Sequence, residues 1–367
     1  MLLSLELITK KIDSNSNFVF LKESKKFLIF DDLYIDLINQ FYTLSIKNFK
    51  DYVLKKFPNS NPKKIYSDLK DLLSIEDIKY VETKKKFTLP QNLNKFKFKL
   101  GDNFFCINYD DIKIVNTIIG QLFHLKEEIN IKPINYYVFK SNGRYFLNEN
   151  DKNIGTWNDM EIHYLTGKLL SLIMCNFHKV EENKWSGFLH ASAVSKDGNA
   201  IVIVGESGSG KSTSCAILSK NDYNFLADDT TPISRDGKVG NFPNSISIKE
   251  PSFQKINDLF LKMNISDTIN ISKGKIKYLN PHGLKRFNPE TINCSTIVRI
   301  KYNSEKQNSL KKVKFIDLLP LIVNESFFPT NMKSVNGFMN WFLNCKCYKL
   351  NYNNDNSLIN FLNKLES

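Results

Sequence analysis

The segment from residue 205 to residue 213 constrains this chain more than any other feature. It reads Gly-Glu-Ser-Gly-Ser-Gly-Lys-Ser-Thr and follows a short run of β-branched residues, Ala200 to Val204. Such a run is typical of a buried parallel strand, and helix-forming residues continue from Ser212 to Lys220 before Asn221. The sequence therefore predicts a strand, a glycine-rich loop and a helix in immediate succession.

A loop in this position is typical of a phosphate-binding site. Glycines at positions 205, 208 and 210 allow successive N–H groups to turn toward an anion, and the following helix adds the positive end of its dipole. In such loops the lysine, here Lys211, reaches the β- and γ-phosphates, while the hydroxyl of Ser212 binds Mg²⁺. We therefore predict that ATP and Mg²⁺ bind at nine consecutive residues: Gly205, Glu206, Ser207, Gly208, Ser209, Gly210, Lys211, Ser212 and Thr213.

Two adjacent carboxylates follow the loop. The run from Tyr223 to Ala227 predicts the next strand, and Asp228 and Asp229 stand at its end, where loops gather around the phosphate site in a sheet of this kind. One acid can hold the metal while the other accepts the proton of an attacking hydroxyl. A plain surface turn is the alternative interpretation.

A histidine precedes the loop. Residues Phe188 to Val194 predict one apolar strand, which a turn at Asp197 and Gly198 joins to the strand before the loop. A hairpin of this kind carries His190 back beside the phosphate site. A histidine that serves only the core is an equally weighted alternative.

Composition excludes several classes of protein. The chain has 367 residues, 42% of them hydrophobic, which suits two or three globular domains. The N-terminus does not resemble a signal peptide and no apolar run approaches the ~20 residues of a membrane span, so we expect a cytoplasmic protein without a membrane partner. The net charge is +13, but only four residues are arginine, so we expect a solvated lysine surface and no nucleic-acid partner. The six cysteines form no CxxC pair and favour reduced thiols.

The chain divides into two predicted domains, residues 1–90 and 91–367. The first combines a hairpin over residues 18–30 with three helices that begin near Asp31, Ser45 and Pro62, which is the outline of a small winged-helix domain. By pattern it resembles the PqqD-like domains that bind leader peptides by strand addition. A dimerisation or purely structural role is the alternative, so a homo-oligomer stays open. The second domain is predicted as α/β, or α+β over the whole chain, with a mixed sheet.

Three motifs of the second domain together resemble one known family. These are Leu189-His190-Ala191, the loop from Gly205 to Thr213, and Phe225-Leu226-Ala227-Asp228-Asp229. In this order and spacing they resemble the HPr kinase/phosphorylase-related kinases, which share a P-loop core with phosphoenolpyruvate carboxykinase. The resemblance spans roughly residues 95 to 350. It implies an ATP-dependent kinase in which His190 faces the γ-phosphate and assists the acids. By the same resemblance, Asp228 supports the metal together with Ser212, and Asp229 is the general base for a substrate hydroxyl.

The chain also departs from that family. HPr kinases proper carry Ser-Glu after the loop lysine and a later Arg-Gly-Leu-Gly signature, whereas this chain has Ser212-Thr213 and the stretch from Phe242 to Glu250. These differences argue against HPr as the substrate. The later stretch resembles the divergent branch found beside lasso-peptide and other genes for ribosomally made peptides, where the acceptor is a serine of a precursor peptide.

The same resemblance names further site residues. Lys249 or Glu250 would approach substrate or metal, and Arg286 would place a cation on the transferring phosphoryl group. Surface charge is the alternative for each of them. Two other functions stay open: a small-molecule kinase acting on an alcohol or sugar, and a non-catalytic regulator that senses nucleotide.

Overall fold

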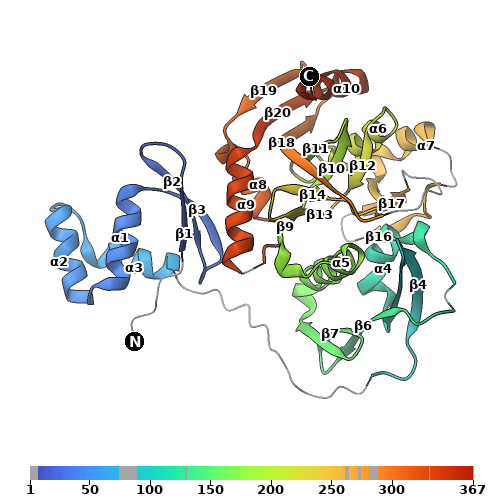
Figure 1. The fold of residues 1–367 in the computed structure, drawn as a ribbon, viewed down its shortest axis with the longest axis horizontal. Helices are drawn as coiled ribbons and strands as arrows, with labels where there is room; N and C mark the ends of the chain where they lie inside the picture. Colours follow the sequence, from blue (N-terminus) through green and yellow to red (C-terminus); the bar gives the residue numbers. More distant parts are fainter. Residues whose placement is uncertain are drawn as a thin grey trace.

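The computed structural model describes residues 7–73, 89–128, 130–260, 264–271, 274–280, 288–329 and 331–366. It is a mixed α/β structure with three main groups of helices and strands, which lie next to one another (Figure 1). Within the described residues no helix combines the length and the apolar character needed to cross a membrane.

The N-terminal body is a three-stranded antiparallel sheet followed by three helices. The predicted hairpin is confirmed, and a further strand pairs with it; the elements are β1 (Leu7–Lys11), β2 (Ser16–Leu21), β3 (Lys26–Asp31), α1 (Asp32–Thr43), α2 (Ile46–Lys56) and α3 (Pro62–Leu73). Asp31 caps α1 and Ser45 caps α2, because each side chain accepts a bond from a free N–H of the first turn. The winged-helix assignment and the boundary at residue 90 remain predictions.

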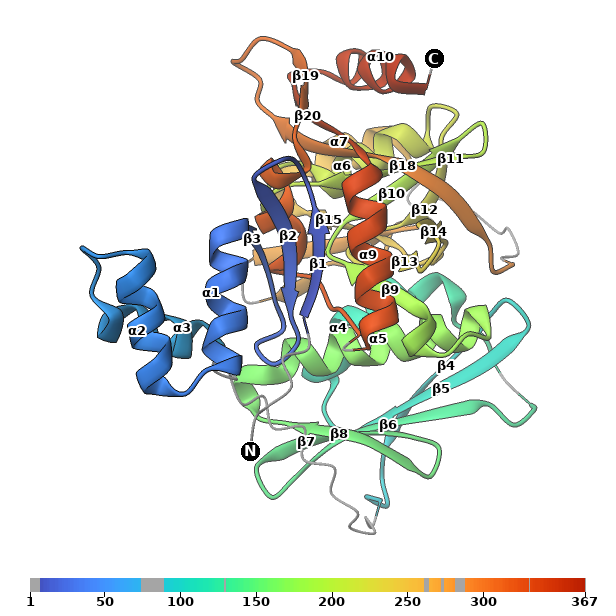
Figure 2. The same ribbon diagram turned by 60° about the vertical axis from the view of Figure 1, so that its left-hand side comes forward.

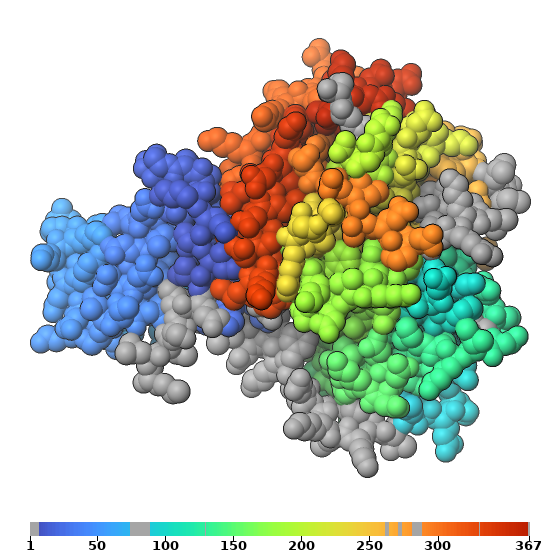
Figure 3. Space-filling model, in the orientation of Figure 1, coloured from blue at the N-terminus to red at the C-terminus, as the bar shows by residue number. Residues whose placement is uncertain are grey.

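The strand β2 buries both of its faces. Val19 and Leu21 point toward the three helices, and Phe18 and Phe20, on the opposite face, join the core that surrounds α9 (Met332–Asn344). Figure 2 shows the small sheet between α1 and α9, and Figure 3 shows the blue N-terminal strands abutting the red C-terminal segment. The N-terminal sheet therefore shares a hydrophobic core with the C-terminal part of the chain.

The second body is a five-stranded sheet covered by helices. Its order is β4-β5-β6-β7-β8, and the hairpin of β6 and β7 turns at Asn142 and Gly143, both with positive φ. Asn158 caps the turn η2 (Asp159–Glu161) that opens α5. The elements are β4 (Asn94–Leu100), β5 (Asn103–Tyr109), α4 (Ile112–Gln121), η1 (Phe123–Leu125), β6 (Ile134–Ser141), β7 (Arg144–Glu149), β8 (Lys152–Trp157) and α5 (Ile162–His178).

The third body is a nine-stranded mixed sheet that carries the predicted site. Its main order is β12-β10-β11-β18-β14-β13-β9, with β20 beside β18 and β19 beside β20. The strands are β9 (Trp185–Leu189), β10 (Ser192–Lys196), β11 (Asn199–Val204), β12 (Asn224–Ala227), β13 (Thr231–Ser234), β14 (Lys238–Gly240), β18 (Thr291–Tyr302), β19 (Ser309–Val313) and β20 (Lys346–Tyr352). The strands β11, β18 and β20 run parallel to one another, so their carboxyl ends meet at one edge.

Helices cover both faces of this sheet. One face packs on α6 (Lys211–Ser219), α7 (Phe253–Leu259) and α10 (Asp355–Glu366), and the other packs on α8 (Leu319–Val323) and α9. Short 3-10 turns connect these elements: η3 (Glu182–Lys184), η4 (Glu250–Ser252) and η6 (Phe315–Asp317). A separate small sheet, in the order β15-β17-β16, is formed by β15 (Ile246–Lys249), β16 (Ile269–Ile271) and β17 (Gly274–Leu279).

The single strand predicted over residues 188–194 is wrong. The chain bends at His190, where Ala191 donates its N–H to the carbonyl of Leu189. The two halves become β9 and β10; β9 is the last strand of the main order, and β10 is second from its other end. The bend is stabilised by a residue distant in sequence, because the hydroxyl of Thr231 donates to the carbonyl of Ala191.

Candidate functional site

The glycine-rich loop has the conformation that its sequence predicts. It leaves β11 at Gly205 and enters α6 through Gly210, whose φ of +97° only glycine adopts readily. Gly208 has a φ of +83°. A side chain at position 205 is excluded by crowding, because its Cβ would lie 2.4 Å from the hydroxyl of Ser209. The loop thus depends on all three glycines, and it ends at the N-terminus of a helix.

Lys211 lies inside this loop. Only 7% of the residue is exposed, and its ammonium donates to the carbonyl of Gly205 at 2.7 Å. Burial lowers the pKa of Lys211, while the negative charges of Asp229 and Asp228 act in the opposite direction. The lysine is therefore a buried cation held between the loop and the two acids.

Asp228 is a buried carboxylate with a full set of partners. It is 1% exposed, and its Oδ1 accepts from the hydroxyls of Ser192 and Ser212, the latter at 3.1 Å. Its Oδ2 accepts from the backbone N–H of Ser247 at 2.9 Å. Burial raises the pKa of Asp228 above its ordinary value, and the charge of Asp229 adds to this effect. The structure therefore brings the predicted metal pair, Ser212 and Asp228, into direct contact.

Asp229 occupies a constrained turn at the same place. Its φ is +61°, a conformation that costs energy for any residue with a side chain, although Asp tolerates it better than most. Thr230 donates its N–H to the carbonyl of Asp228 at 2.7 Å and closes the turn. The hydroxyl of Ser247 donates to Oδ2 of Asp229 at 2.5 Å. This turn orients the two neighbouring acids differently, so that Asp228 is buried and Asp229 is partly exposed.

One β-strand supplies contacts to both acids and to the loop. In β15, Ile246 and Ile248 enter the core, whereas Ser247 reaches the acids and the Lys249 ammonium reaches the Ser207 hydroxyl at 2.9 Å. In this strand isoleucine alternates with a polar residue, and this alternation predicts that Ser247 and Lys249 share one face. Lys249 was predicted as a site residue from the sequence, and Ser247 was not.

Glu250 lies in a different contact from the one that the sequence predicts. It forms an exposed ion pair with Lys275 at 3.4 Å and, among the residues that the structure describes, no hydrogen bond or ion pair with the loop or the acids. Arg286 lies outside the described residues. Of the two neighbours proposed from sequence, Lys249 is therefore the one at the loop.

A buried network behind Asp228 fixes its backbone. The amide of Asn244 donates to the carbonyl of Asp228 at 2.7 Å, and its oxygen accepts from the Asp228 N–H at 3.2 Å. His124 supports the segment around Asn244 from the opposite side, with Nε2 3.1 Å from the carbonyl of Pro243 and Nδ1 2.8 Å from the hydroxyl of Ser245.

The partners of His124 determine its protonation. A carbonyl can only accept, so Nε2 carries the proton and Nδ1 accepts from the hydroxyl of Ser245. Burial lowers the pKa of His124 to about 4, and the ring is neutral at pH 7. Neither residue was predicted from the sequence, because the groups that they support are distant along the chain. His124 is 121 residues from Ser245, and Asn244 is 16 residues from Asp228.

His190 lies near the acids, but its polar contacts are with another segment of the chain. Leu189 pairs with Thr231 and Ala193 pairs with Ala227, so the bend at His190 faces the turn that holds Asp229. The Nε2 of His190 is 3.5 Å from Oε2 of Glu325, and the backbone N–H of His190 donates to the hydroxyl of Ser326.

Glu325 connects this histidine to the loop. Its charge raises the pKa of Lys211 against the effect of burial, which places Glu325 within electrostatic range of that ammonium. The residue follows a short helix and has no distinguishing sequence pattern, so only the fold reveals it. His190 and Glu325 together form an ionisable pair at the rim of the site.

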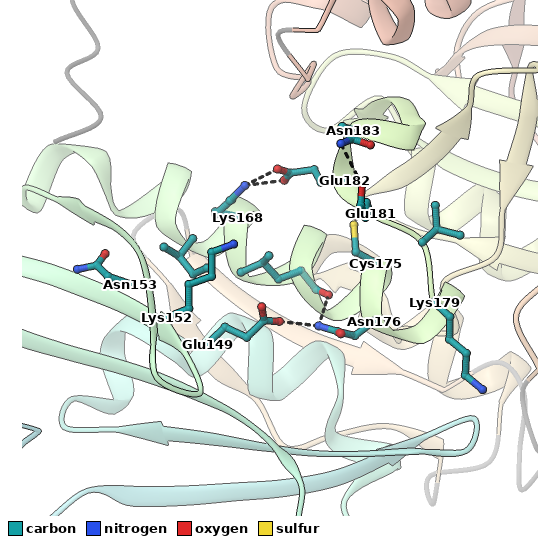
Figure 4. A pocket seen from close by; sticks show the side chains of 13 residues that line it. Glu149, Lys152, Asn153, Lys168, Cys175, Asn176, Lys179, Glu181, Glu182 and Asn183 are labelled. Carbon is teal, nitrogen blue, oxygen red and sulfur yellow. Dashed lines mark hydrogen bonds and ion pairs between the residues drawn. The ribbon is translucent and has the colours of Figure 1, made fainter. Parts of the chain in front are cut away.

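A separate cleft lies away from the loop and the acids. It has a volume of about 880 Å³ and opens between α5, β8 and the segment at residues 179–183 (Figure 4). Its charged groups largely pair with neighbours: Lys168 with Glu182, and Glu149 with the amide of Asn176. None of the residues that line it belongs to the loop or to the acid pair.

Comparisons with known proteins give little further information. No family model matches the chain, and no curated protein matches it. One solved structure, the Hpr(Ser) kinase/phosphatase from Coxiella burnetii, is similar to 48% of this chain and 97% of its own, with 11% identity and a TM-score of 0.24. A TM-score of this size does not establish a shared fold.

Proposed function

We propose that this protein is an ATP-dependent kinase that transfers the γ-phosphoryl group to a hydroxyl. The observation that carries the proposal is the contact between the Ser212 hydroxyl and the Asp228 carboxylate, with Asp229 beside them in a constrained turn. A loop that only bound phosphate would have no need for two acids with different environments at its mouth. In a kinase, one acid serves the metal and the other serves the acceptor.

The loop and two lysines would bind the triphosphate. The backbone N–H groups at the start of α6 suit the bridging phosphates, and Lys211 is already positioned within the loop by its bond to Gly205. Lys249 adds a second cation at Ser207, on the outer side of the loop. These cations would offset the charge that spreads over the phosphoryl oxygens during transfer.

The donor set fits Mg²⁺. Ser212 and Asp228 offer a hydroxyl and a carboxylate oxygen 3.1 Å apart, and Mg²⁺ is commonly held by one or two such groups and by phosphate oxygens. When bound, the ion would neutralise charge on the β- and γ-phosphates. Burial of Asp228 without a cationic side chain in bonding contact agrees with this role, because its bonding partners in the described residues are hydroxyls and an N–H.

Asp229 would act as the general base. The acceptor oxygen attacks the γ-phosphorus as the bond to the ADP oxygen breaks, and Asp229 takes the proton that the acceptor loses. The bond from Ser247 holds one oxygen of Asp229 and leaves the other for the acceptor. His190 and Glu325 would assist from the side, by fixing the position of the acceptor.

We further propose a serine of a precursor peptide as the acceptor. The motifs that resemble the divergent kinases of peptide biosynthesis support this choice. The N-terminal sheet adds support, because β1 and β3 are both edge strands within it, and an edge strand can bind an extended peptide by strand addition.

The test is to incubate the protein with Mg-ATP and peptides encoded by neighbouring genes, and to follow added phosphate by mass spectrometry. We expect one phosphate on a serine, and none with Asp229→Asn. Transfer to small alcohols or sugars but to no peptide would support the kinase proposal and contradict the proposal of a peptide acceptor. ATP binding without any transfer or hydrolysis would instead favour a nucleotide-sensing regulator.

A further inference from the structure

An exposed tyrosine stands at the end of the strand next to the loop strand. Tyr302 is the last residue of β18 and is 46% exposed. It pairs with Tyr352, the last residue of the parallel strand β20. On the other side of β18, Val204 at the end of β11 pairs with Arg299. Two tyrosines therefore stand at the carboxyl edge of the sheet, directly beside the glycine-rich loop.

Tyr302 is tied to the loop by its backbone. Its N–H donates to the carbonyl of Ser209 at 3.0 Å. A Cβ built at Gly210 would lie 3.5 Å from the Cβ of Tyr302 and 3.0 Å from the hydroxyl of Tyr352. The aromatic pair therefore adjoins the point at which α6 begins, where the loop would hold phosphates.

Tyr352 holds the exposed ring in place. It is buried, and its hydroxyl is 2.6 Å from the hydroxyl of Ser214 in α6. The two rings have centroids 5.5 Å apart with an interplanar angle of 59°. The ammonium of Lys255 lies 5.9 Å from the centroid of the Tyr302 ring and is itself paired with Asp355. Tyr302 is thus an exposed ring with fixed neighbours, whose position costs little to maintain on binding.

The sheet order gives this ring a direction relative to the acids. In the order β12-β10-β11-β18, the strand β12, which Asp228 directly follows, lies on one side of the loop strand β11, and β18, which ends in Tyr302, lies on the other side. A triphosphate in the loop with its γ-phosphate toward the acids would therefore direct its nucleoside toward Tyr302.

We propose that Tyr302 is the stacking platform for the purine base of the bound nucleotide. This assignment rests on the proposed kinase function. Stacking on an aromatic ring requires only a π-face, so the larger purine rings bind better than pyrimidines and Tyr302 does not itself separate adenine from guanine. Lys255 and Asp355 border the ring and limit where the base can lie.

The experiment separates the base from the phosphates. Isothermal titration in the presence of Mg²⁺ would measure the affinity of the full chain for ATP and for inorganic tripolyphosphate, which has no base. We expect Tyr302→Ala and Tyr302→Leu to weaken ATP about tenfold and to leave tripolyphosphate unchanged. Tyr302→Phe retains the ring and should bind ATP as the wild type does. Tyr164→Ala removes another half-exposed tyrosine, on α5, and is the matched control.

Each remaining outcome decides between the claims. Equal weakening of ATP and tripolyphosphate by Tyr302→Ala would show that the residue only supports the loop and would overturn the platform. Equal wild-type affinity for ATP and tripolyphosphate would overturn the platform and leave the phosphate site intact. If the wild-type protein bound neither, the proposed function would fall and the platform with it.

Discussion

At the scale of single residues, one serine donates a hydrogen bond to each of the two acids. The N–H of Ser247 binds Asp228, and its hydroxyl binds Asp229. The two carboxylates differ in exposure, because Asp228 is buried and Asp229 is partly exposed. In the proposed mechanism, Ser247 is therefore a positioning residue for both the metal side and the acceptor side of the site.

Ser247→Ala tests this role. The substitution keeps the N–H to Asp228 and removes only the bond to Asp229. A hydrogen bond to a charged group contributes about 1.5–3 kcal/mol, so we expect phosphoryl transfer to slow about tenfold or more while ATP affinity stays within about twofold. Transfer rates and titration measure the two effects. Ser219→Ala, which removes a hydroxyl at the far end of α6, is the control and should change neither.

His124 gives a pH-dependent prediction. Its pKa falls from 6.5 when unfolded to about 4 in the fold, so the unfolded chain binds more protons over this range and stability is lost as the pH falls from 6.5 to 4. The loss from this group approaches about 3 kcal/mol. The free energy of unfolding, measured in urea at several values between pH 4 and 7, should depend less steeply on pH for His124→Gln than for the wild type. The same pH dependence in both proteins would contradict the assignment.

At the scale of elements, local patterns predicted much of the fold. The strand β11, the loop and α6 follow from a β-branched run, three glycines and helix formers, each of which acts within a few residues. The caps at Asp31 and Ser45 are local in the same way. All of these predictions are confirmed.

Contacts between distant segments could not be predicted. The strand break at His190 depends on Thr231, and the support of Asp228 depends on Asn244 and, through it, on His124. No periodicity in the sequence links these positions. The site was therefore predictable where one segment supplies the chemistry, at Gly205 to Thr213 and at the acids, and unpredictable where several segments hold it.

Gly210→Ala tests the loop as an element. The residue has a φ of +97°, and an added Cβ would lie 3.0 Å from the Tyr352 hydroxyl. We expect ATP affinity to fall more than about tenfold, because either the loop or the tyrosine must move. Gly198→Ala is matched in backbone conformation, with a φ of +80°, but its Cβ would meet nothing within 4 Å. The free energy of unfolding of both variants should fall by about 1 kcal/mol, but the affinity for ATP should fall only in Gly210→Ala.

At the scale of the whole molecule, the N-terminal sheet belongs to two cores. Phe27 has ring contacts with Phe18 and Phe20 in its own sheet, and with Phe328, which precedes α9, and Phe338, which lies in α9; the centroids are 4.8–5.8 Å apart. An attached domain on a flexible linker would not share so many rings with its neighbour. We therefore expect residues 1–90 to stabilise the rest of the chain, in addition to the peptide recognition that we propose for them.

Deletion of residues 1–90 should expose this apolar surface. We expect residues 91–367 to unfold at a temperature several degrees lower than the full chain and to bind an apolar dye, as measured by differential scanning fluorimetry. In the full chain, Phe27→Ala should cost about 3–5 kcal/mol, whereas Tyr34→Ala, at an exposed position of α1, should cost much less. An unchanged melting temperature after the deletion would show that the two parts are energetically independent.

The most direct test of the kinase proposal compares wild type with Asp229→Asn in one preparation each, for Mg-ATP affinity and for phosphoryl transfer to the acceptor. Asparagine keeps the size of the side chain and its bond with Ser247 but cannot take a proton. We predict that affinity stays within about threefold while transfer falls at least about a hundredfold. Transfer at the wild-type rate by Asp229→Asn would contradict the account.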